Sequence, residues 1–191
     1  MSLLYTICFC RCRDKVLMLH RNKPPNAGLW NGLGGKIEAG ETPLVCIRRE
    51  VWEEAGIDLG KAARLRFAGI VSWDAGVDRT RPSTGMYAYV ADLDDGWPVF
   101  ADPVATPDGR LAWQPIAWVC GRANRAVVAN LPYVLPALLA DGEPMEQHCQ
   151  YVDGWLTGVV TRPLSVLVVY QATVAVDQAR PGNVGWPYGA C

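Results

Sequence analysis

The sequence predicts an α/β fold, organised as one domain or as one domain with an appendage. Three observations support this prediction. The chain has 191 residues and half of them are apolar, which is enough to form a proper core. Several short segments are rich in β-forming residues. One segment has the apolar spacing of a helix, and a long loop rich in glycine and proline precedes it.

The first predicted elements are two strands and this long loop. Residues 3–12 are rich in β-formers, residues 13–15 form a turn, and residues 16–21 return as a second strand. The loop over residues 22–41 contains two prolines and five glycines. Long ordered loops are usually functional, so we expect this loop to contribute to a site.

A helix is predicted from Pro43 to about Ala55. Thr42 is suited to cap its first turn, and proline is well tolerated at the first helical position. Gly56 fits the left-handed position that often ends a helix. The apolar stripe of the helix follows the spacing i, i+3, i+7 and consists of Leu44, Ile47 and Val51.

The remaining chain is predicted to form strands, one short helix and a tail. Strands are expected within residues 64–75, 85–93 and 110–119, a short helix interrupted by Pro136 over 131–142, and a terminal strand or hairpin over 145–162. Residues 163–191 combine an uncharged, β-prone stretch with an irregular end. We therefore predict a domain over residues 1–162 and a C-terminal appendage of uncertain order over 163–191.

The charge balance argues against some classes of function. The net charge is −1 and the pI is about 6.1, so the chain lacks the electrostatic footprint of a protein that binds DNA or RNA as a polymer. A small anionic substrate remains compatible with this charge, because a bound metal can supply positive charge locally. The first ten residues show no basic leader, and no apolar run approaches the ~20 residues that span a bilayer. We therefore expect a cytoplasmic protein that has no membrane partner.

The seven cysteines are scattered along the chain. Cys8, Cys10 and Cys12 alternate, so a strand places them on one face. Structural zinc sites use longer spacings, and we interpret these residues as small apolar side chains that stay reduced. His20 and His148 have no partner at a recognisable spacing, so we interpret both as structural residues.

Three carboxylates share one face of the predicted helix. Glu50, Glu53 and Glu54 stand at i, i+3 and i+4, where like charges repel by about 0.2–0.5 kcal/mol per pair. A solvated acidic face is the ordinary explanation for such a cluster. A divalent cation on that face would remove the repulsion, and Mg²⁺ prefers hard oxygen ligands, often together with substrate phosphates.

The surrounding residues favour the metal-binding interpretation. From Gly35 onward the chain reads G-x5-E-x7-R-E-U-x-E-E-x-G-U, where U is aliphatic. The nine specified positions are Gly35, Glu41, Arg49, Glu50, Val51, Glu53, Glu54, Gly56 and Ile57. This pattern resembles the box of the Nudix hydrolase family at every specified position. The resemblance extends more weakly over about residues 3–156, and it implies the Nudix α/β/α sandwich with a mixed sheet.

The resemblance also implies roles for single residues. The implied metal ligands are Gly35, Glu50, Glu53 and Glu54. Arg49 is expected to pair with Glu41 and to brace the loop against the helix. One carboxylate among Glu53, Glu54 and Asp108 is expected to take the proton of the attacking water. Asp108 matches an acid that relatives carry before a late strand, although an ordinary Asp-Gly turn explains it equally well.

The stretch NAGLWNGLGGKIEAGET resembles the segment before the box in the MutT and 8-oxo-dGTP diphosphatase group. In that group the asparagine after tryptophan hydrogen-bonds the purine, which implies this role for Asn31, with a turn residue as the alternative. The implied substrate-binding residues are Thr6, Trp30, Asn31, Lys36, Met86 and Asn130. Mammalian-type sanitising enzymes read the oxidised purine with two adjacent aspartates, whereas residues 127–136 here offer only Asn130.

The predicted activity is the hydrolysis of an NTP or dNTP to NMP and pyrophosphate, with Mg²⁺ as cofactor and Mn²⁺ as its alternative. Oxidised purine dNTPs such as 8-oxo-dGTP belong to the expected substrates, and a small nucleotide is the expected partner, while the sequence does not predict an oligomeric state. Two alternatives remain. One is a Nudix hydrolase for ADP-ribose or a dinucleotide, and the other is a non-catalytic Nudix domain that binds a nucleotide as a regulator. The intact box argues against the regulator.

Overall fold

The structure is a computed structural model, and it describes residues 2–74, 84–97 and 103–174. In this part of the chain nine strands form one sheet. The strands are β1 (Ser2–Cys12), β2 (Lys15–Arg21), β3 (Trp30–Asn31), β4 (Arg64–Trp73), β5 (Thr84–Asp92), β6 (Val104–Thr106), β7 (Gly109–Pro115), β8 (Met145–Val152) and β9 (Trp155–Pro163). Residue 1, the segments 75–83 and 98–102, and residues 175–191 lie outside the described residues, and with them the end of the predicted appendage.

The sheet is mixed, as the sequence predicts. Its order is β6-β7-β2-β1-β5-β4-β8-β9, and β3 pairs with β2 beside this path. The pairs β1–β5 and β4–β8 are parallel, and the other pairs of this sheet are antiparallel. The last two strands form the hairpin that was one of the two forms expected for residues 145–162.

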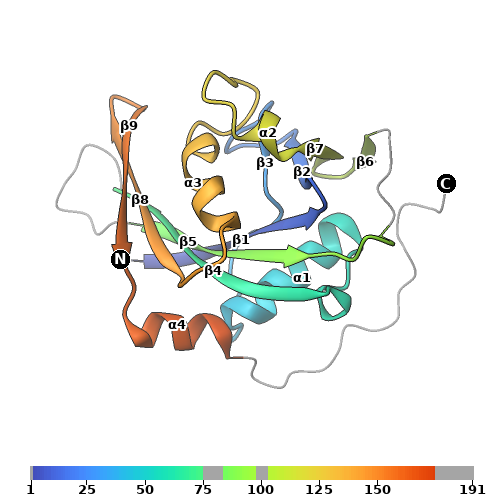
Figure 1. The fold of residues 1–191 in the computed structure, drawn as a ribbon, viewed down its shortest axis with the longest axis horizontal. Coiled ribbons are helices and arrows are strands. Elements are labelled where there is room, and N and C mark those ends of the chain that lie inside the picture. Colours follow the sequence, from blue (N-terminus) through green and yellow to red (C-terminus); the bar gives the residue numbers. More distant parts are fainter. Residues whose placement is uncertain (1, 75–83, 98–102, 175–191) are drawn as a thin grey trace.

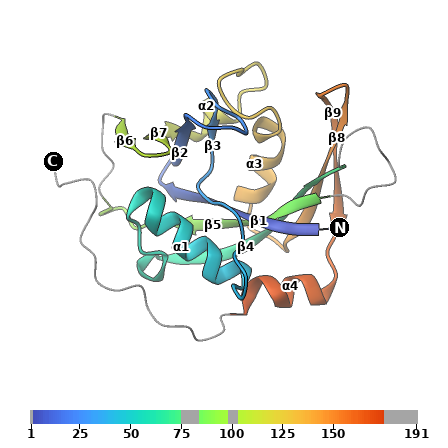
Figure 2. The ribbon, with the colours of Figure 1, turned by 180° about the vertical axis from the view of Figure 1, so that it is seen from behind.

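Helices cover both faces of the sheet, which confirms the predicted sandwich (Figure 1 and, from behind, Figure 2). Helices α1 (Pro43–Ala55) and α4 (Val166–Thr173) lie on one face. Helix α3 (Leu131–Leu139) and the short α2 (Ile116–Val119) lie on the other. A 3-10 turn, Leu59–Lys61, follows α1. None of the described helices has the length and apolar character needed to cross a membrane.

Alternation along β1 divides the core into two layers. Cys8, Cys10 and Cys12 pack in the layer beneath α1, whereas Ile7 and Phe9 pack in the layer beneath α3. All five side chains are buried. The cysteines of the described residues are free thiols, as the sequence interpretation expects.

Helix α1 begins and ends where the sequence predicts. The Thr42 hydroxyl accepts a hydrogen bond from the Val45 N–H at 3.3 Å and so caps the first turn. Gly56 ends the helix in the left-handed conformation, with φ of 65°. Ile47 and Val51 are fully buried against the sheet, so the acidic face of the helix is turned toward the preceding loop.

Helix α4 is a departure from local preference. Its residues have high β-propensity, yet residues 166–173 are helical and pack against α1 and β4. The Ala172 side chain is fully buried, and its carbonyl oxygen accepts a hydrogen bond from the Tyr89 hydroxyl at 2.8 Å. Part of the predicted appendage therefore contributes to the core beneath the acidic helix.

Candidate active site

Arg49 gathers the acids of the loop and of helix α1. Its Nε and Nη2 donate to the two carboxylate oxygens of Glu41 at 2.7 and 2.9 Å, which confirms the predicted pair. Its Nη1 donates to Glu50 at 2.8 Å and to Glu53 at 3.1 Å. The bonds from Arg49 hold the pKa of Glu41 below its ordinary value. Since a bidentate arginine–carboxylate pair fixes geometry as well as charge, the loop is held against the helix.

Glu54 lies deeper than the other acids of α1. Its side chain is buried, and one carboxylate oxygen accepts a hydrogen bond from the Gly34 N–H at 2.8 Å. Burial raises the pKa of Glu54 to about 8, and the negative charges of Glu50 and Asp108 act in the same direction. Glu54 is thus a buried carboxyl group, and the positive charge near it is too small to favour its ionised form at neutral pH.

Glycines allow the loop to approach these acids. A Cβ atom on Gly34, whose φ is 139°, would lie 2.3 Å from the Thr6 carbonyl oxygen, so only glycine fits there. A Cβ atom on Gly35 would lie 2.5 Å from the Glu50 carboxylate. The Gly35 carbonyl oxygen accepts a hydrogen bond from the Thr6 N–H at 2.8 Å and retains a second lone pair.

The donor set fits a hard divalent cation. Burial raises the pKa of Glu50 as well as that of Glu54, so both groups would gain from a nearby cation. The available donors are carboxylate oxygens and the Gly35 carbonyl oxygen, which are the ligands that Mg²⁺ and Mn²⁺ accept. As they stand, the described acidic side chains do not converge into a group of three or more ligands, because Arg49 pairs with Glu50 and Glu53.

Asp108 lies on the turn between β6 and β7. Its carboxylate accepts a hydrogen bond from Lys23 Nζ at 2.8 Å, and its side chain is half-exposed. The charge of Asp108 is close enough to raise the pKa of Glu54, so the fold brings these two predicted acids toward one another.

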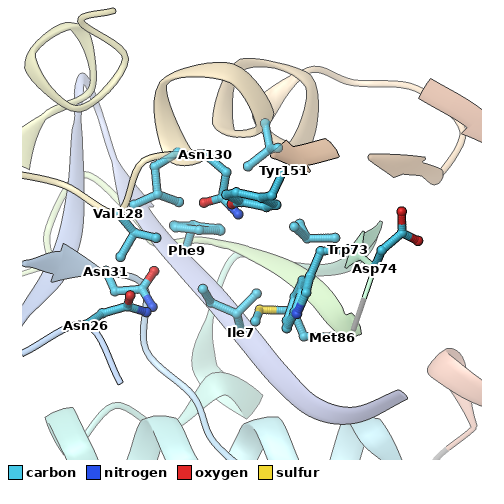
Figure 3. Close-up of a pocket in the computed structure, with 13 residues that line it drawn as sticks. Ile7, Phe9, Asn26, Asn31, Trp73, Asp74, Met86, Val128, Asn130 and Tyr151 are labelled. Atoms are coloured by element: carbon cyan, nitrogen blue, oxygen red, sulfur yellow. The ribbon is translucent and has the colours of Figure 1, made fainter. Parts of the chain in front are cut away.

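A cavity of about 340 Å³ opens on the other face of the sheet (Figure 3). Its lining residues are Ile7, Phe9, Asn26, Asn31, Val71, Trp73, Asp74, Met86, Val128, Asn130, Leu131, Val134 and Tyr151. Three predicted substrate-binding residues, Asn31, Met86 and Asn130, are among them. The walls are mostly apolar and the polar groups few, as in pockets that bind small molecules.

Thr6 requires a correction, because it does not line the cavity. Its hydroxyl lies 3.3 Å from the Cys46 thiol of α1, on the opposite face of the sheet. Its neighbour Ile7 lines the cavity instead. Side chains alternate along a strand, so an error of one residue transfers a side chain to the other face.

Trp30 and Lys36 also lie outside the cavity lining. The Trp30 ring packs on His20 with 5.0 Å between the ring centroids, and this gives His20 a structural contact. The Lys36 carbonyl oxygen accepts a hydrogen bond from Arg49 Nη2 at 3.2 Å. Lys36 is thus tied to the acidic loop rather than to the cavity.

Of the aromatic end of the cavity, the sequence suggests Trp73 only as one of four tryptophans that could stack on a base, with Trp30, Trp113 and Trp118, and it gives no indication of Tyr151. Trp73 stands at the end of β4 and Tyr151 at the end of β8, and both line the cavity although they are far apart in the sequence. The parallel pairing of β4 with β8 brings them to the same end of the sheet. Trp73 lies near the end of the strand predicted within residues 64–75, whereas Tyr151 carries no comparable signal.

Comparison with known proteins agrees with this geometry. The model of the NUDIX domain family matches residues 3–132. A Mycobacterium tuberculosis protein provisionally named 8-oxo-dGTP diphosphatase 2 is 33% identical over 133 residues, which cover 66% of this chain and 85% of that protein. The crystal structure of a MutT protein from Bacillus halodurans superposes with a TM-score of 0.63 at 25% identity and covers 82% of this chain and 95% of the other.

A further relative matches only in part. The NAD-capped RNA hydrolase NudC of Chromobacterium violaceum is 36% identical over 84 residues, which cover 44% of this chain. The matched region spans 28% of the length of that relative, so the likeness concerns one part of a longer protein.

Proposed function

The chain belongs to the NUDIX domain family, and from this premise we propose that it is a metal-dependent nucleotide pyrophosphohydrolase. The proposed substrate is an NTP or dNTP, oxidised purine dNTPs such as 8-oxo-dGTP included, and the proposed products are NMP and pyrophosphate. One observation carries this proposal. A single segment of the chain joins a cavity of about 340 Å³ to Glu54, the buried acid of α1.

This segment runs from Asn31, which lines the cavity, to Gly34, which donates to Glu54. Three residues of extended chain reach about 10 Å at most. A nucleotide whose base occupies the cavity can therefore extend its phosphates toward the acids. The likeness to the MutT protein and to the Mycobacterium tuberculosis relative supports the same substrate class.

Some residues of the chain are proposed to hold the metal ion, and others to position the loop or to accept a proton. The proposed metal-holding oxygens belong to Gly35, Glu50, Glu53 and Glu54. A divalent cation, when bound there, would neutralise phosphate charge and lower the pKa of a water molecule. Arg49 and Glu41 keep the loop at a fixed distance from the helix. Glu53, Glu54 or Asp108 accepts the proton of the attacking water.

A dinucleotide substrate is the second candidate. The partial likeness to the NAD-capped RNA hydrolase favours it, because that name implies a substrate that contains a dinucleotide. It would use the same acids and the same cavity, and it would differ in the group that leaves.

The test is a turnover assay with a panel of nucleotides in the presence of Mg²⁺, Mn²⁺ or EDTA. We expect activity only with a divalent metal. Glu53→Gln and Glu54→Gln should each lower kcat by about 10²-fold or more, the scale of a lost proton acceptor, with folding retained. Glu143→Gln removes an exposed carboxylate outside the site and serves as the control. Near-normal turnover in both active-site variants would overturn the assignment of this helix face.

A further inference from the structure

Strand β9 is the outermost strand of the sheet. It pairs with β8 along one side, and within the described residues the strand order ends with it. Figure 1 shows β9 at the margin of the ribbon, with α4 following its C-terminal end. A strand edge presents N–H and C=O groups that can bind a further strand, and proteins usually protect such an edge with charged residues or proline. From Trp155 to Thr161, β9 contains neither.

Apolar side chains are exposed beside this edge. Of the eleven large apolar residues that the described chain exposes, six lie within residues 152–170. These six, which we call the edge patch, are Val152, Trp155, Val160, Val166, Leu167 and Tyr170. Trp155 is 75% exposed and Val166 is 86% exposed, so neither side chain contributes to the core of its own chain. Exposed apolar surface that gathers in one region marks an interaction site.

The strand residues of the edge patch lie on the same face of the sheet as α4. Tyr151 lines the cavity on the α3 face, and side chains alternate along a strand, so Val152 lies on the α4 face. Trp155 pairs directly with Val152 and therefore shares this face. Val160 pairs with His148, which alternation also places on the α4 face. Trp155 thus stands at one end of β9, and the apolar start of α4 follows the other end on the same face.

This arrangement is complementary to itself. When a second copy adds its β9 antiparallel to this β9, a two-fold axis relates the two copies. The end of β9 in one copy then lies beside the start of β9 in the other, so Val166 and Leu167 approach the partner subunit's Trp155. Arg162 is the single charged residue of β9, and the two-fold axis directs the two copies of it toward opposite ends of the interface. The edge therefore pairs with itself without repulsion between like charges.

The surface is large enough for a stable dimer. A strand of nine residues is about 30 Å long and a sheet layer is about 10 Å thick, so the edge alone offers roughly 300 Å². Aromatic side chains such as Trp155 and Tyr170 bury about 150–250 Å² each. Together with its aliphatic members, the edge patch brings the surface to the roughly 800 Å² per partner that specific interfaces bury.

We propose that β9 and the edge patch form the interface of a two-fold symmetric homodimer, in which the sheets of two copies join edge to edge. The partner is thus a second copy of this chain. The inference does not depend on the proposed function, since none of the acids of α1 belongs to the interface.

The test measures the mass of the full chain in solution by light scattering and the Kd of its dimer by sedimentation. We expect twice the chain mass of 20.9 kDa. Trp155→Lys and Val166→Glu should each raise the Kd by about 30-fold or more, the scale of one interface hot spot. Both side chains are exposed in the single chain, so the fold should be retained.

The double variant Trp155→Lys/Val166→Glu tests the two-fold geometry itself. It places opposite charges beside one another across the axis, so the dimer should regain about 10-fold or more in Kd relative to either single variant. Leu4→Lys is the matched control, because Leu4 is an exposed apolar residue of β1 outside the edge patch. It should leave the Kd unchanged.

Amide hydrogen exchange checks that the strands pair. Backbone amides of residues 157–162 should exchange more slowly in the wild-type dimer than in Trp155→Lys. A dimer whose Kd is the same in both single variants, or a double variant without recovery, would overturn the inference. A monomeric wild type would also overturn it and would leave this surface to residues 175–191 or to a different protein.

Discussion

At the scale of single residues, the burial of Glu54 conflicts with the role of metal ligand that we propose for it. Its carboxylate is buried, accepts the Gly34 N–H and has a pKa raised to about 8. Desolvation of a charge opposes folding, whereas a metal ligand has to be ionised. We infer that the free chain is strained electrostatically at this residue, and that a bound cation relieves the strain.

We predict that Glu54→Gln stabilises the metal-free chain at neutral and alkaline pH. The folded pKa of Glu54, about 8, exceeds the unfolded value of about 4.3. The stability contributed by protonated Glu54 is therefore full below about pH 4 and is lost as the pH rises to about 8. Gln keeps the acceptor for Gly34 and does not titrate. Thermal midpoints measured in EDTA should differ little at pH 5 and by several degrees at pH 8.

Glu143→Gln is the control in this comparison, because Glu143 is exposed. Its midpoint should follow that of wild type across the same pH range. Parallel curves for Glu54→Gln and wild type would show that burial does not hold the proton on Glu54.

The arrangement of the acids along α1 is easier to predict from the sequence than the lining of the cavity, for a physical reason. Spacing within one helix places Glu50, Glu53 and Glu54 on one side of α1 without knowledge of the fold, and Arg49 of the same helix reaches back to Glu41, just before its first turn. The cavity depends instead on which face of a strand a side chain takes and on strands that meet across the sheet. Spacing alone does not provide either kind of information.

At the scale of elements, α4 shows how packing overrides local preference. Its valines favour strands, yet the residues that pack on the core follow a helical spacing and are Leu164, Val168, Val169 and Ala172. This helical spacing is present in the sequence and indicates a helix, whereas the β-propensity of the same residues indicates a strand. The hairpin β8–β9, by contrast, matches one of the two forms that the sequence predicts.

We predict that α4 supports the stability of the domain and not its chemistry. A chain ending at Arg162 should melt several degrees below a chain ending at Val174, because it loses the buried Ala172 and the partner of the Tyr89 hydroxyl. Each kcal/mol lost lowers the midpoint by about 2–4 °C in a chain of this size. The measurements are thermal midpoints and kcat/KM well below the melting range.

Hydrolysis should stay within about threefold in both shortened chains, because the proposed catalytic residues precede α4. Equal thermal midpoints of the chains ending at Arg162 and at Val174 would show that α4 is not needed for stability. That result would agree with the proposed domain boundary at residue 162. A folded 1–162 chain with little activity would instead place α4 in the working domain.

At the scale of the whole molecule, the sheet separates the cavity proposed for recognition from the acids proposed for chemistry. The cavity lies on the α3 face, and the acids lie on the α1 face, with the loop from Asn31 to Gly35 between them. The predicted sandwich with a mixed sheet is confirmed, because the box and its context determine the family fold. The strand order across the sheet could not be read from the sequence, since pairing of β1 with β5 is not local.

We predict that Mg²⁺ raises the thermal midpoint of the whole domain. A ligand that binds only the folded chain adds about 2.7 kcal/mol at a hundred times its Kd. This corresponds to a rise of roughly 5–10 °C for a chain of this length. Glu50→Gln should lose most of the rise and Glu143→Gln none of it, and EDTA should reverse it. If Mg²⁺ left the thermal midpoint of wild type unchanged, this result would argue against a metal on this helix face.

The parallel pair of β1 and β5 also affects the order in which the protein can fold during its synthesis. Leu3 pairs with Gly85, so β1 lacks one of its neighbouring strands until β5 has been synthesised. At about 5–20 residues per second, this delay is on the order of ten seconds. Helix α1 emerges during the delay, before the sheet that buries Ile47 and Val51 is complete. The apolar side chains of α1 therefore stay exposed for that interval, until β5 completes the sheet that buries them.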